Sequence, residues 1–349
     1  MPIEADSVAA TLAQMERRLR GIVPDIELRY KAELVFEINR LKKERGAIIL
    51  GHNYMEPALF HTVADEVGDS LELSRKAAAT RCDPIVFCGV RFMAETAKIL
   101  NPERTVLLPA RRAGCSLAES ITAADIRQLR RWFPGAPIVT YINTYADVKA
   151  ECDVCCTSSN AARVVQSLDS EVVVFVPDEY LAANTAAETG RTIIFASRAG
   201  VDAAAADRPY QMVGWRGRCE VHERFTVADI ERARAQFPGV MVLAHPECSP
   251  EVVAAADFAS STSRMTAAVR ESSAPCYLLL TECSMADNIM AANPDKQMVR
   301  MCSIRCPHMN EITLEDTLAA LRHDRYAIEV PEDVRRRARR ALDRMLAVR

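Results

Sequence analysis

Three apolar runs along the chain end in polar residues, and each run predicts a buried strand with a polar tip. The runs span Ala47–Tyr54, Ile138–Asn143 and Met241–Glu247. A continuous apolar run, without alternation, is typical of a parallel strand that helices cover on both faces. Each run is followed by a serine-rich segment, which indicates the start of a helix.

The same order of features recurs three times along the chain. In each copy, 16 to 18 residues separate a polar tip residue from a serine at the helix start: His52 and Ser70, Tyr141 and Ser158, His245 and Ser261. A second strand is expected after each serine-rich helix, at Ile85–Val90, Val172–Val176 and Tyr277–Thr281. Another helix and a short third strand follow, and each copy closes on a cysteine: Cys115, Cys219 or Cys306. This recurrence predicts three copies of one structural unit.

The order of strands and helices predicts an α/β fold with three αβα three-layer units, each built on a short parallel sheet. Right-handed crossovers place the C-terminal ends of the strands and the following helix N-termini at one edge of each sheet. We expect an approximate threefold axis to bring these edges together around a central active-site cleft. The expected units are residues 47–115, 116–220 and 221–306, with N-terminal helices in 1–46 and a C-terminal helical segment in 307–349.

The segments outside the three runs have weaker patterns. The pattern of residues 1–46 predicts two helices. The second helix, over about 26–45, has Leu34, Ile38 and Leu41 along one face. Residues 331–349 begin with proline and acids and then become arginine-rich, which suits one helix aligned with its own dipole. The alanine-rich stretch 196–208 lacks an apolar pattern and predicts a surface loop.

Composition narrows the class of protein. Apolar residues make up 49% and charged residues 26% of the chain, which is ordinary for a globular protein. A net charge of −3 argues against a nucleic-acid surface. No apolar run is long enough to cross a membrane, and the first twenty residues do not resemble a secretory signal. We therefore expect a cytoplasmic protein without nucleic-acid or membrane partners.

The twelve cysteines need an explanation other than disulfides, because thiols in a reducing compartment stay reduced. They could be buried apolar side chains, a redox switch or metal ligands. No local zinc-binding spacing joins Cys115, Cys219 and Cys306, which are separated by 104 and 87 residues. One cysteine from each unit would place three thiolates around the threefold axis. That set suits a 4Fe–4S cluster with one iron left open, or a zinc ion with an open fourth position.

Several motifs along the chain resemble those of the quinolinate synthase family. They include GHNYMEP, VGDSLELSRKAA, AGCSL, VTYINTY, GRCEVHERF, LAHPEC and CPHM, in order between about residues 26 and 320. The resemblance implies three pseudo-symmetric αβα units and a 4Fe–4S cluster whose open iron acts as a Lewis acid. It also implies condensation of iminoaspartate with dihydroxyacetone phosphate to quinolinate, phosphate and two waters, in de novo NAD biosynthesis. A partner that supplies iminoaspartate is expected in that pathway.

The motifs also assign residues by resemblance. The implied cluster ligands are Cys115, Cys219 and Cys306. The implied catalytic residues are Glu247, His245, Tyr141 and Tyr54. The implied substrate-binding residues are His52, Ser70, Asn143, Ser158, His222, Ser261 and Thr262. From the residues themselves we add one expectation: burial and nearby negative charge should raise the pKa of Glu247, which would suit proton transfer.

Two other functions remain compatible with parts of the pattern. Another hydro-lyase with an open-iron cluster would share the cysteines but would not need dihydroxyacetone phosphate. A non-catalytic iron–sulfur or thiol sensor would not need the His245 and Glu247 pair or the serine-rich helix starts. The oligomeric state, the source of iminoaspartate, the order of condensation and cyclisation, and any oxidation of Cys302 with Cys306 stay open at this stage.

Overall fold

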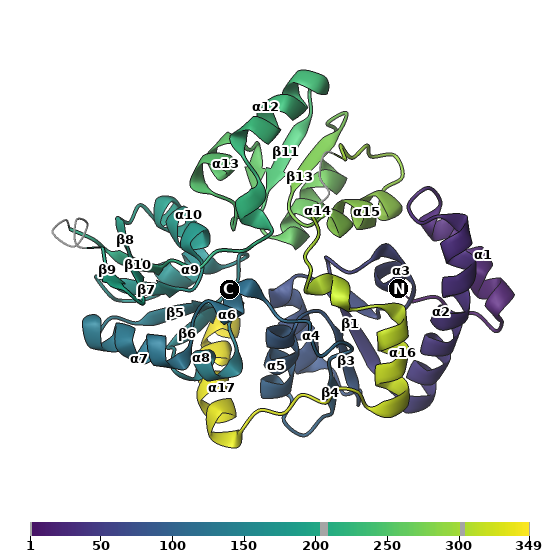
Figure 1. The fold of residues 1–349 in the computed structure, drawn as a ribbon, viewed down its shortest axis with the longest axis horizontal. Coiled ribbons are helices and arrows are strands. Elements are labelled where there is room, and N and C mark those ends of the chain that lie inside the picture. Colours follow the sequence, from purple (N-terminus) through teal and green to yellow (C-terminus); the bar gives the residue numbers. More distant parts are fainter. Residues whose placement is uncertain (1, 203–208, 301–303, 349) are drawn as a thin grey trace. The chain divides into compact units, whose positions relative to one another are not determined.

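The computed structural model describes residues 2–202, 209–300 and 304–348. Its strands form three short sheets with flanking helices (Figure 1), so the predicted α/β class with three αβα units is confirmed. The chain divides into two compact units, of which the first contains residues 1–114, 232–243 and 262–329. The second contains residues 115–231, 244–261 and 330–349.

The first sheet lies in the first unit and has the order β2–β1–β3–β4, with all neighbouring strands parallel. Its strands are β1 (Ile48–His52), β2 (Glu66–Gly68), β3 (Ile85–Cys88) and β4 (Val106–Leu107). Helices α4 and α5 lie on one face and α16 on the other (Figure 1). These helices span Ser70–Ala79, Arg91–Leu100 and Leu314–His323. Because both faces are covered, β3 is buried throughout, as its continuous apolar sequence predicts.

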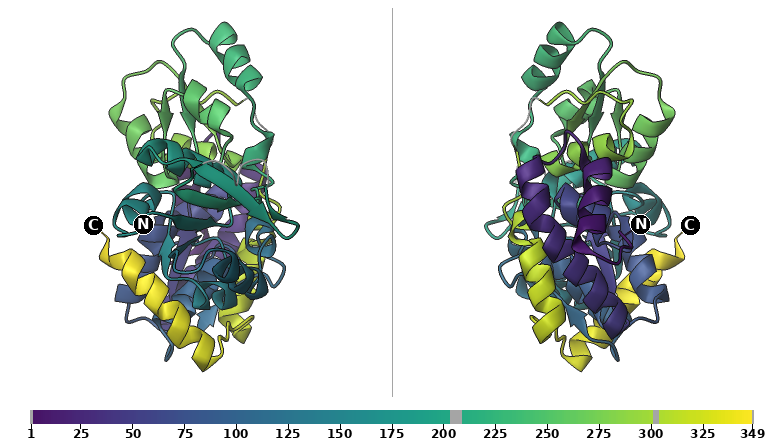
Figure 2. Two further views of the ribbon diagram at one scale, coloured as in Figure 1. Left: turned by 90° about the vertical axis from the view of Figure 1, so that its left-hand side faces the viewer. Right: turned by 90° about the vertical axis from the view of Figure 1, so that its right-hand side faces the viewer.

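The two predicted N-terminal helices are present as α1 (Val8–Leu19) and α2 (Asp25–Arg45). They pack side by side in the first unit, as the purple helices of Figure 2 show. The buried stripe of α2 differs from the expected one, since Ile38 is buried while Leu34 and Leu41 are only half-buried at its edge. The fully buried stripe consists of Leu28, Ala32, Val35, Ile38 and Lys42.

The second sheet lies in the second unit and has the order β6–β5–β7–β10–β8–β9. Its strands are β5 (Ile138–Tyr141), β6 (Val154–Cys156), β7 (Val173–Val176), β8 (Ile193–Ser197), β9 (Gly200–Val201) and β10 (Met212–Trp215). Only β9 pairs antiparallel, with β8. The predicted loop over 196–208 is therefore wrong in its first part, because residues 196–201 form the end of β8 and a hairpin with β9. Residues 203–208 lie outside the described part of the chain.

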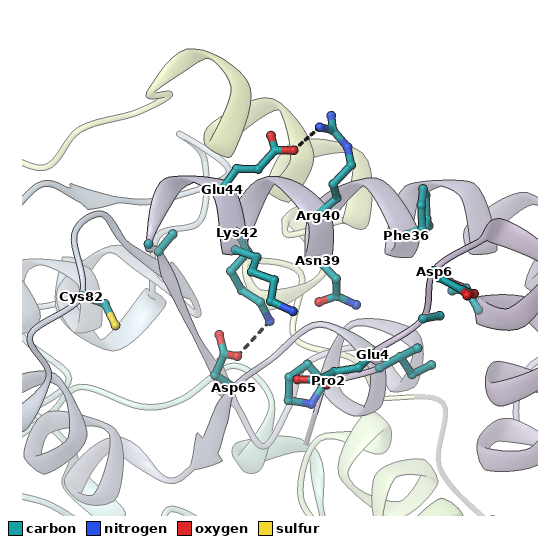
Figure 3. Close-up of a pocket in the computed structure, with 16 residues that line it drawn as sticks. Pro2, Glu4, Asp6, Phe36, Asn39, Arg40, Lys42, Glu44, Asp65 and Cys82 are labelled. Atoms are coloured by element: carbon teal, nitrogen blue, oxygen red, sulfur yellow. Dashed lines mark hydrogen bonds and ion pairs between the residues drawn. The ribbon is translucent and has the colours of Figure 1, made fainter.

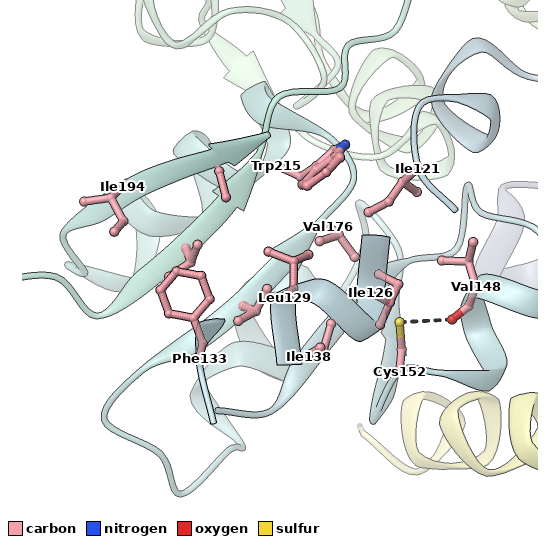
Figure 4. Close-up of a cluster of buried hydrophobic side chains, with 13 residues drawn as sticks. Ile121, Ile126, Leu129, Phe133, Ile138, Val148, Cys152, Val176, Ile194 and Trp215 are labelled. Atoms are coloured by element: carbon pink, nitrogen blue, oxygen red, sulfur yellow. Dashed lines mark hydrogen bonds between the residues drawn. The ribbon is translucent and has the colours of Figure 1, made fainter. Parts of the chain in front are cut away.

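Helices cover this second sheet on both faces. Helices α9 (Ala161–Gln166) and α10 (Glu179–Thr189) contact one face, and α7 (Ala123–Trp132) packs on the other. Figure 4 shows the apolar cluster under α7, where Ile126 and Leu129 meet strand residues such as Ile138. The C-terminal helix α17 (Glu332–Ala347) packs against α8 (Ala146–Ala150) and β6, and it confirms the helix expected over 331–349.

The third sheet has the order β12–β11–β13, which repeats the second–first–third order of the other two sheets. Its strands are β11 (Met241–Ala244), β12 (Phe258–Ala259) and β13 (Tyr277–Leu280). The remaining elements are α3 (Pro57–Thr62), α6 (Ser116–Glu119), η1 (His222–Arg224), α12 (Val227–Gln236), α13 (Pro250–Ala255), α14 (Thr262–Glu271), α15 (Cys283–Ala292) and η2 (Met309–Glu311).

Each of the three sheets contains a short strand that sequence analysis missed. Strands β2, β6 and β12 have two or three residues each, and the short helices α3, α8 and α13 precede them. A strand of that length is too short to show a hydrophobic period, so its pairing comes from the neighbouring strand. Among the described residues, no helix is both long and apolar enough to span a membrane.

Candidate active site

The three candidate ligand cysteines share one backbone arrangement. In each repeat, the residue that begins the helix after β3, β7 or β13 donates its N–H to the carbonyl two positions before the cysteine. The three bonds are Arg91 to Ala113 at 2.8 Å, Glu179 to Gly217 at 2.7 Å and Cys283 to Ile304 at 3.1 Å. Each of these bonds lies within one compact unit. The repeat therefore extends to the segments that carry Cys115, Cys219 and Cys306.

A second backbone bond also recurs at these cysteines. The residue four positions later donates its N–H to the carbonyl of the cysteine: Glu119 to Cys115 at 3.0 Å, Glu223 to Cys219 at 3.0 Å and Asn310 to Cys306 at 3.1 Å. Each cysteine thus opens a helical turn. At Cys219, burial raises the pKa of the thiol, and the backbone N–H groups of His222 and Val221 lower it only in part.

Exposure separates these cysteines from most of the others. Cys115, Cys219 and Cys306 are half-buried residues, as is Cys82. Six other described cysteines are buried: Cys88, Cys152, Cys155, Cys156, Cys248 and Cys276. Burial raises the pKa of Cys88 and of Cys155 to about 12. Cys283 is disulfide-bonded, contrary to the expectation of reduced thiols, and Cys302 lies outside the described residues.

Glu247 is the centre of a buried polar group in the second unit. Glu247 follows β11 in the chain, and the residue is 3% exposed. The Tyr141 hydroxyl, at the end of β5, donates to Glu247 Oε1 at 2.5 Å, and the Asn143 amide donates to the same oxygen at 3.3 Å. On the other side, His222 Nδ1 lies 2.7 Å from Glu247 Oε2. Sequence analysis named all four residues, and the structure brings them together.

His222 joins this group to a candidate ligand cysteine. Its Nδ1 also lies 3.2 Å from the Cys219 sulfur, and its ring stacks on that of His245 with centroids 4.6 Å apart and 24° between the planes. Cys219, His222 and Glu247 each offer one donor atom to a common point, since these atoms lie within 4.8 Å of one another. Burial, followed by the charges of Glu247 and Cys115, raises the pKa of Cys219. A bound cation would remove that cost by displacing the thiol proton.

The predicted upward shift of the Glu247 pKa is wrong in direction. Burial does raise this pKa, but the charge and hydrogen bond of His222, with His245 and Tyr141, outweigh burial and hold the pKa well below its usual range. The carboxylate therefore stays ionised. The buried carboxyl of Asp178, which sequence analysis did not single out, is shifted the opposite way, because burial and then the charge of Glu247 raise its pKa.

The buried polar atoms of the second unit that lack a hydrogen-bond partner among the described residues include two that belong to residues named by sequence analysis. They are the Asn143 Oδ1 and the hydroxyl of Ser261, which is 0% exposed. Buried polar atoms are almost always satisfied, so an orphaned one indicates a place for a ligand or water. Both were named by sequence as substrate-binding residues. Ser158, in the same unit, is half-buried in the loop between β6 and α9.

The first unit holds the equivalent strand tip, with His52 and Tyr54. The Tyr54 backbone N–H donates to His52 Nδ1 at 3.2 Å, just as the Glu247 N–H donates to His245 Nδ1 at 3.3 Å. In a neutral ring this leaves the proton on Nε2, so both histidines present that N–H as a donor. The Tyr54 hydroxyl lies 2.5 Å from Thr281 Oγ1, a contact that sequence analysis did not predict.

The serine-rich helix starts differ from the expected caps. Ser70 begins α4, but Asp69 is the cap, because its carboxylate accepts from the N–H groups of Leu71 and Glu72 at 3.0 Å each. Thr262, which begins α14, accepts instead from the Asn53 amide at 2.9 Å. The serine hydroxyl at the start of α4 is thus not needed as a cap.

A large cavity of the first unit lies away from this strand tip. It measures about 590 Å³ and lies between the N-terminal segment and α2 (Figure 3). Four of its charged side chains form ion pairs, with Lys42 2.9 Å from Asp65 and Arg40 2.5 Å from Glu44. The polar residues named by sequence do not line it, so it is not the candidate active site.

Comparison with known proteins identifies the family of the chain. The sequence model of the family described as "Quinolinate synthetase A protein" matches residues 36–347. The chain belongs to this family. Quinolinate synthase 2 of Mesorhizobium japonicum is 49% identical over 342 residues, which cover 98% of this chain and 99% of that protein.

Two further relatives of the quinolinate synthetase A family are equally similar. The quinolinate synthase of Agrobacterium fabrum is 48% identical over 336 residues, covering 96% of this chain and 92% of that protein. The quinolinate synthase of Xylella fastidiosa is 51% identical over 316 residues, covering 90% and 86% respectively. His52, Tyr54, Ser70, Thr262 and Cys306 lie in the first unit and the other named residues in the second. That all of them line one cleft stays a prediction.

Proposed function

We propose that this chain is a quinolinate synthase, which condenses iminoaspartate with dihydroxyacetone phosphate to quinolinate, phosphate and two waters in NAD biosynthesis. The observation that carries the proposal is the buried group around Glu247, with Tyr141, Asn143 and His222 in hydrogen-bond reach and Cys219 beside His222. A non-catalytic sensor has no need for an ionised carboxylate joined to a phenol and an imidazole in a buried site.

The donor set fits an iron–sulfur cluster. The segments of Cys115, Cys219 and Cys306 have the same two backbone hydrogen bonds, and each of these residues is half-buried. We assign them as the three ligands of a 4Fe–4S cluster. When bound, such a cluster with one open iron supplies a Lewis acid for a hydroxyl or carbonyl oxygen of the substrate.

The residues of the chain supply binding and proton transfer. Glu247 is an ionised acceptor between the Tyr141 hydroxyl and His222 Nδ1, so it can relay a proton between these two groups during imine formation, enolisation and water loss. His52 and His245 would donate from Nε2 to substrate oxygens. The free oxygens of Asn143 and Ser261 are suited to an amine and a carboxylate or phosphate, and Ser70, Ser158 and Thr262 add hydroxyls to the same task.

The decisive assay follows quinolinate formation from the two substrates, with protein purified anaerobically and its iron and sulfide measured. The proposed activity requires both substrates. Absence of product with a full cluster would remove this function. Turnover of another hydroxy acid without dihydroxyacetone phosphate would favour a different hydro-lyase.

Tyr141→Phe tests the proton path without removing the carboxylate. The variant loses the hydroxyl that donates to Glu247, so we expect kcat to fall by about tenfold or more while the cluster stays full. Loss of this bond also removes one cause of the low Glu247 pKa, so the acid limb of the kcat/KM profile should move to higher pH. Tyr145→Phe in the same unit is a matched control, since the Tyr145 hydroxyl contacts the carboxylate of Glu119 instead. An unchanged rate and pH profile in Tyr141→Phe would contradict the path.

A further inference from the structure

Asn184 lies in the middle of α10 and binds the turn that follows β11. Its amide Nδ2 donates to the Pro246 carbonyl at 2.8 Å and to the Cys248 carbonyl at 3.0 Å. These two carbonyls lie on either side of Glu247, and all four residues belong to the second unit. Asparagine has a low helix propensity, because its side chain competes for backbone groups in other conformations. Its presence inside α10 therefore indicates a role in tertiary structure.

Asn288 makes the same pair of bonds in the first unit. Its amide Nδ2 donates to the Asn53 carbonyl at 3.1 Å and to the Met55 carbonyl at 2.9 Å, and these carbonyls flank Tyr54. Asn288 is 4% exposed and is the sixth residue of α15, just as Asn184 is the sixth residue of α10. Helix α10 follows β7 and helix α15 follows β13. The two asparagines thus occupy one position of the repeat.

The two bound turns are also alike. The residue three positions after each histidine donates its N–H to the carbonyl of that histidine, at 2.9 Å for His245 and 3.0 Å for His52. The residue two positions after the histidine, Glu247 or Tyr54, donates its own N–H to the histidine Nδ1. With the asparagine amide added, the backbone is hydrogen-bonded before, at and after Glu247 and Tyr54. A backbone held in this way fixes the direction in which each side chain leaves the turn.

The first repeat has threonine at the equivalent position. Thr96 is the sixth residue of α5, which follows β3, and its hydroxyl donates to the Phe92 carbonyl of the same helix at 2.8 Å. A hydroxyl has one hydrogen, so it cannot serve two carbonyls as a primary amide does. The paired bond is therefore made by the helices of the second and third repeats, and it is directed at the turns that carry Glu247 and Tyr54.

We propose that Asn184 and Asn288 are positioning residues for the reaction, and that each holds the backbone on both sides of one catalytic residue. The proposal rests on the proposed function, in which Glu247 and Tyr54 are catalytic. Asn184 acts through Glu247, whose two oxygens contact their partners at 2.5 and 2.7 Å, and Asn288 acts through Tyr54. Reacting groups that are misplaced by about 1 Å can lose on the order of 100-fold in rate.

Asn184→Leu is the first test, because leucine is of similar size but has no donor for the two carbonyls. In anaerobically purified protein of measured iron content, we expect kcat per cluster to fall about tenfold or more. KM for both substrates should change by less than about twofold, because the carboxylate acts on the chemical step. Asn293→Leu is the matched control, since this half-buried asparagine donates its amide to the Ile289 carbonyl at 2.8 Å. The control should keep the normal kcat, and an equal fall in both variants would overturn the proposal.

Double-mutant cycles test whether each asparagine acts through the residue that it flanks. In a Glu247→Gln background the positioned carboxylate is absent, so Asn184→Leu should lower kcat no further. Asn288→Leu should likewise have no further effect in a Tyr54→Phe background. Effects that multiply in either cycle would overturn the positioning role of the asparagine concerned.

Circular dichroism shows whether Asn184→Leu folds. If it does not, Asn184→Ala, which leaves room for water at the two carbonyls, carries the same comparison. A normal kcat in a folded, iron-loaded Asn184 variant, with Glu247→Gln slowed, would overturn this role of Asn184 and leave the proposed function intact. A normal kcat in Glu247→Gln would overturn the catalytic role of Glu247, and the role of Asn184 with it.

Discussion

Glu247→Gln should lower turnover by roughly 100-fold or more while leaving the iron content unchanged. Glutamine fits the same space, but it cannot take up a proton, and its amide nitrogen would face either the Tyr141 hydroxyl or His222. The relay between these two groups is then broken. Because Glu247 is ionised in the native site, the substitution also removes the negative charge that His222 and His245 stabilise.

The measurement is the rate per cluster, determined from iron and sulfide, rather than the rate per milligram. Glu251→Gln is a matched control, because it makes the same change at an exposed position of α13 in the same unit. If Glu247 only braces the fold, the variant will lose thermal stability or iron, and the folded fraction will turn over normally. That pattern would remove Glu247 from the proposed catalytic group.

Replacing any one of the three proposed ligand cysteines should prevent the protein from holding the iron–sulfur cluster. Cys115→Ala, Cys219→Ala and Cys306→Ala each remove one of three thiolates, so we expect loss of the brown chromophore and of activity. Iron, sulfide and the visible spectrum of anaerobically purified protein measure this. A full cluster in any of the three variants would exclude that cysteine as a ligand.

Cys156→Ser is the matched control for these substitutions. Cys156 lies at the end of β6 in the second unit and is fully buried, and burial raises the pKa of its thiol well above the usual range. The serine hydroxyl will be buried in an apolar place, which should cost about 1–3 kcal/mol of stability. Iron content should nevertheless stay full, because Cys156 does not close a repeat and its unit already holds two of the proposed ligands, Cys115 and Cys219.

Local pattern in the sequence was sufficient for the fold class and the repeat. The continuous apolar runs at β1, β5 and β11 predict that these strands are buried, because a parallel strand covered by helices on both faces has no polar side. The polar residues at their ends, such as Tyr141 and His245, follow from the same runs. Recurrence of one cysteine in each copy singled out Cys115, Cys219 and Cys306 among twelve.

The short strands and the helix caps were decided by neighbours in space. Strand β12 has only Phe258 and Ala259, too few residues for any period, and its pairing with β11 exists because β11 offers a free edge. At α4 the sequence suggested a serine cap, but the carboxylate of Asp69 is the better acceptor for two N–H groups.

The chemistry of Glu247 was determined by tertiary structure. The sequence showed a carboxylate at a buried strand end, from which desolvation alone predicts a raised pKa. The fold brings Tyr141, 106 residues away, and His222 onto its two oxygens, and their hydrogen bonds and charge reverse that shift. The candidate site residues could be predicted from sequence because strand ends and repeats are local properties of the chain. The ionisation of Glu247 depends on contacts that only the folded chain creates.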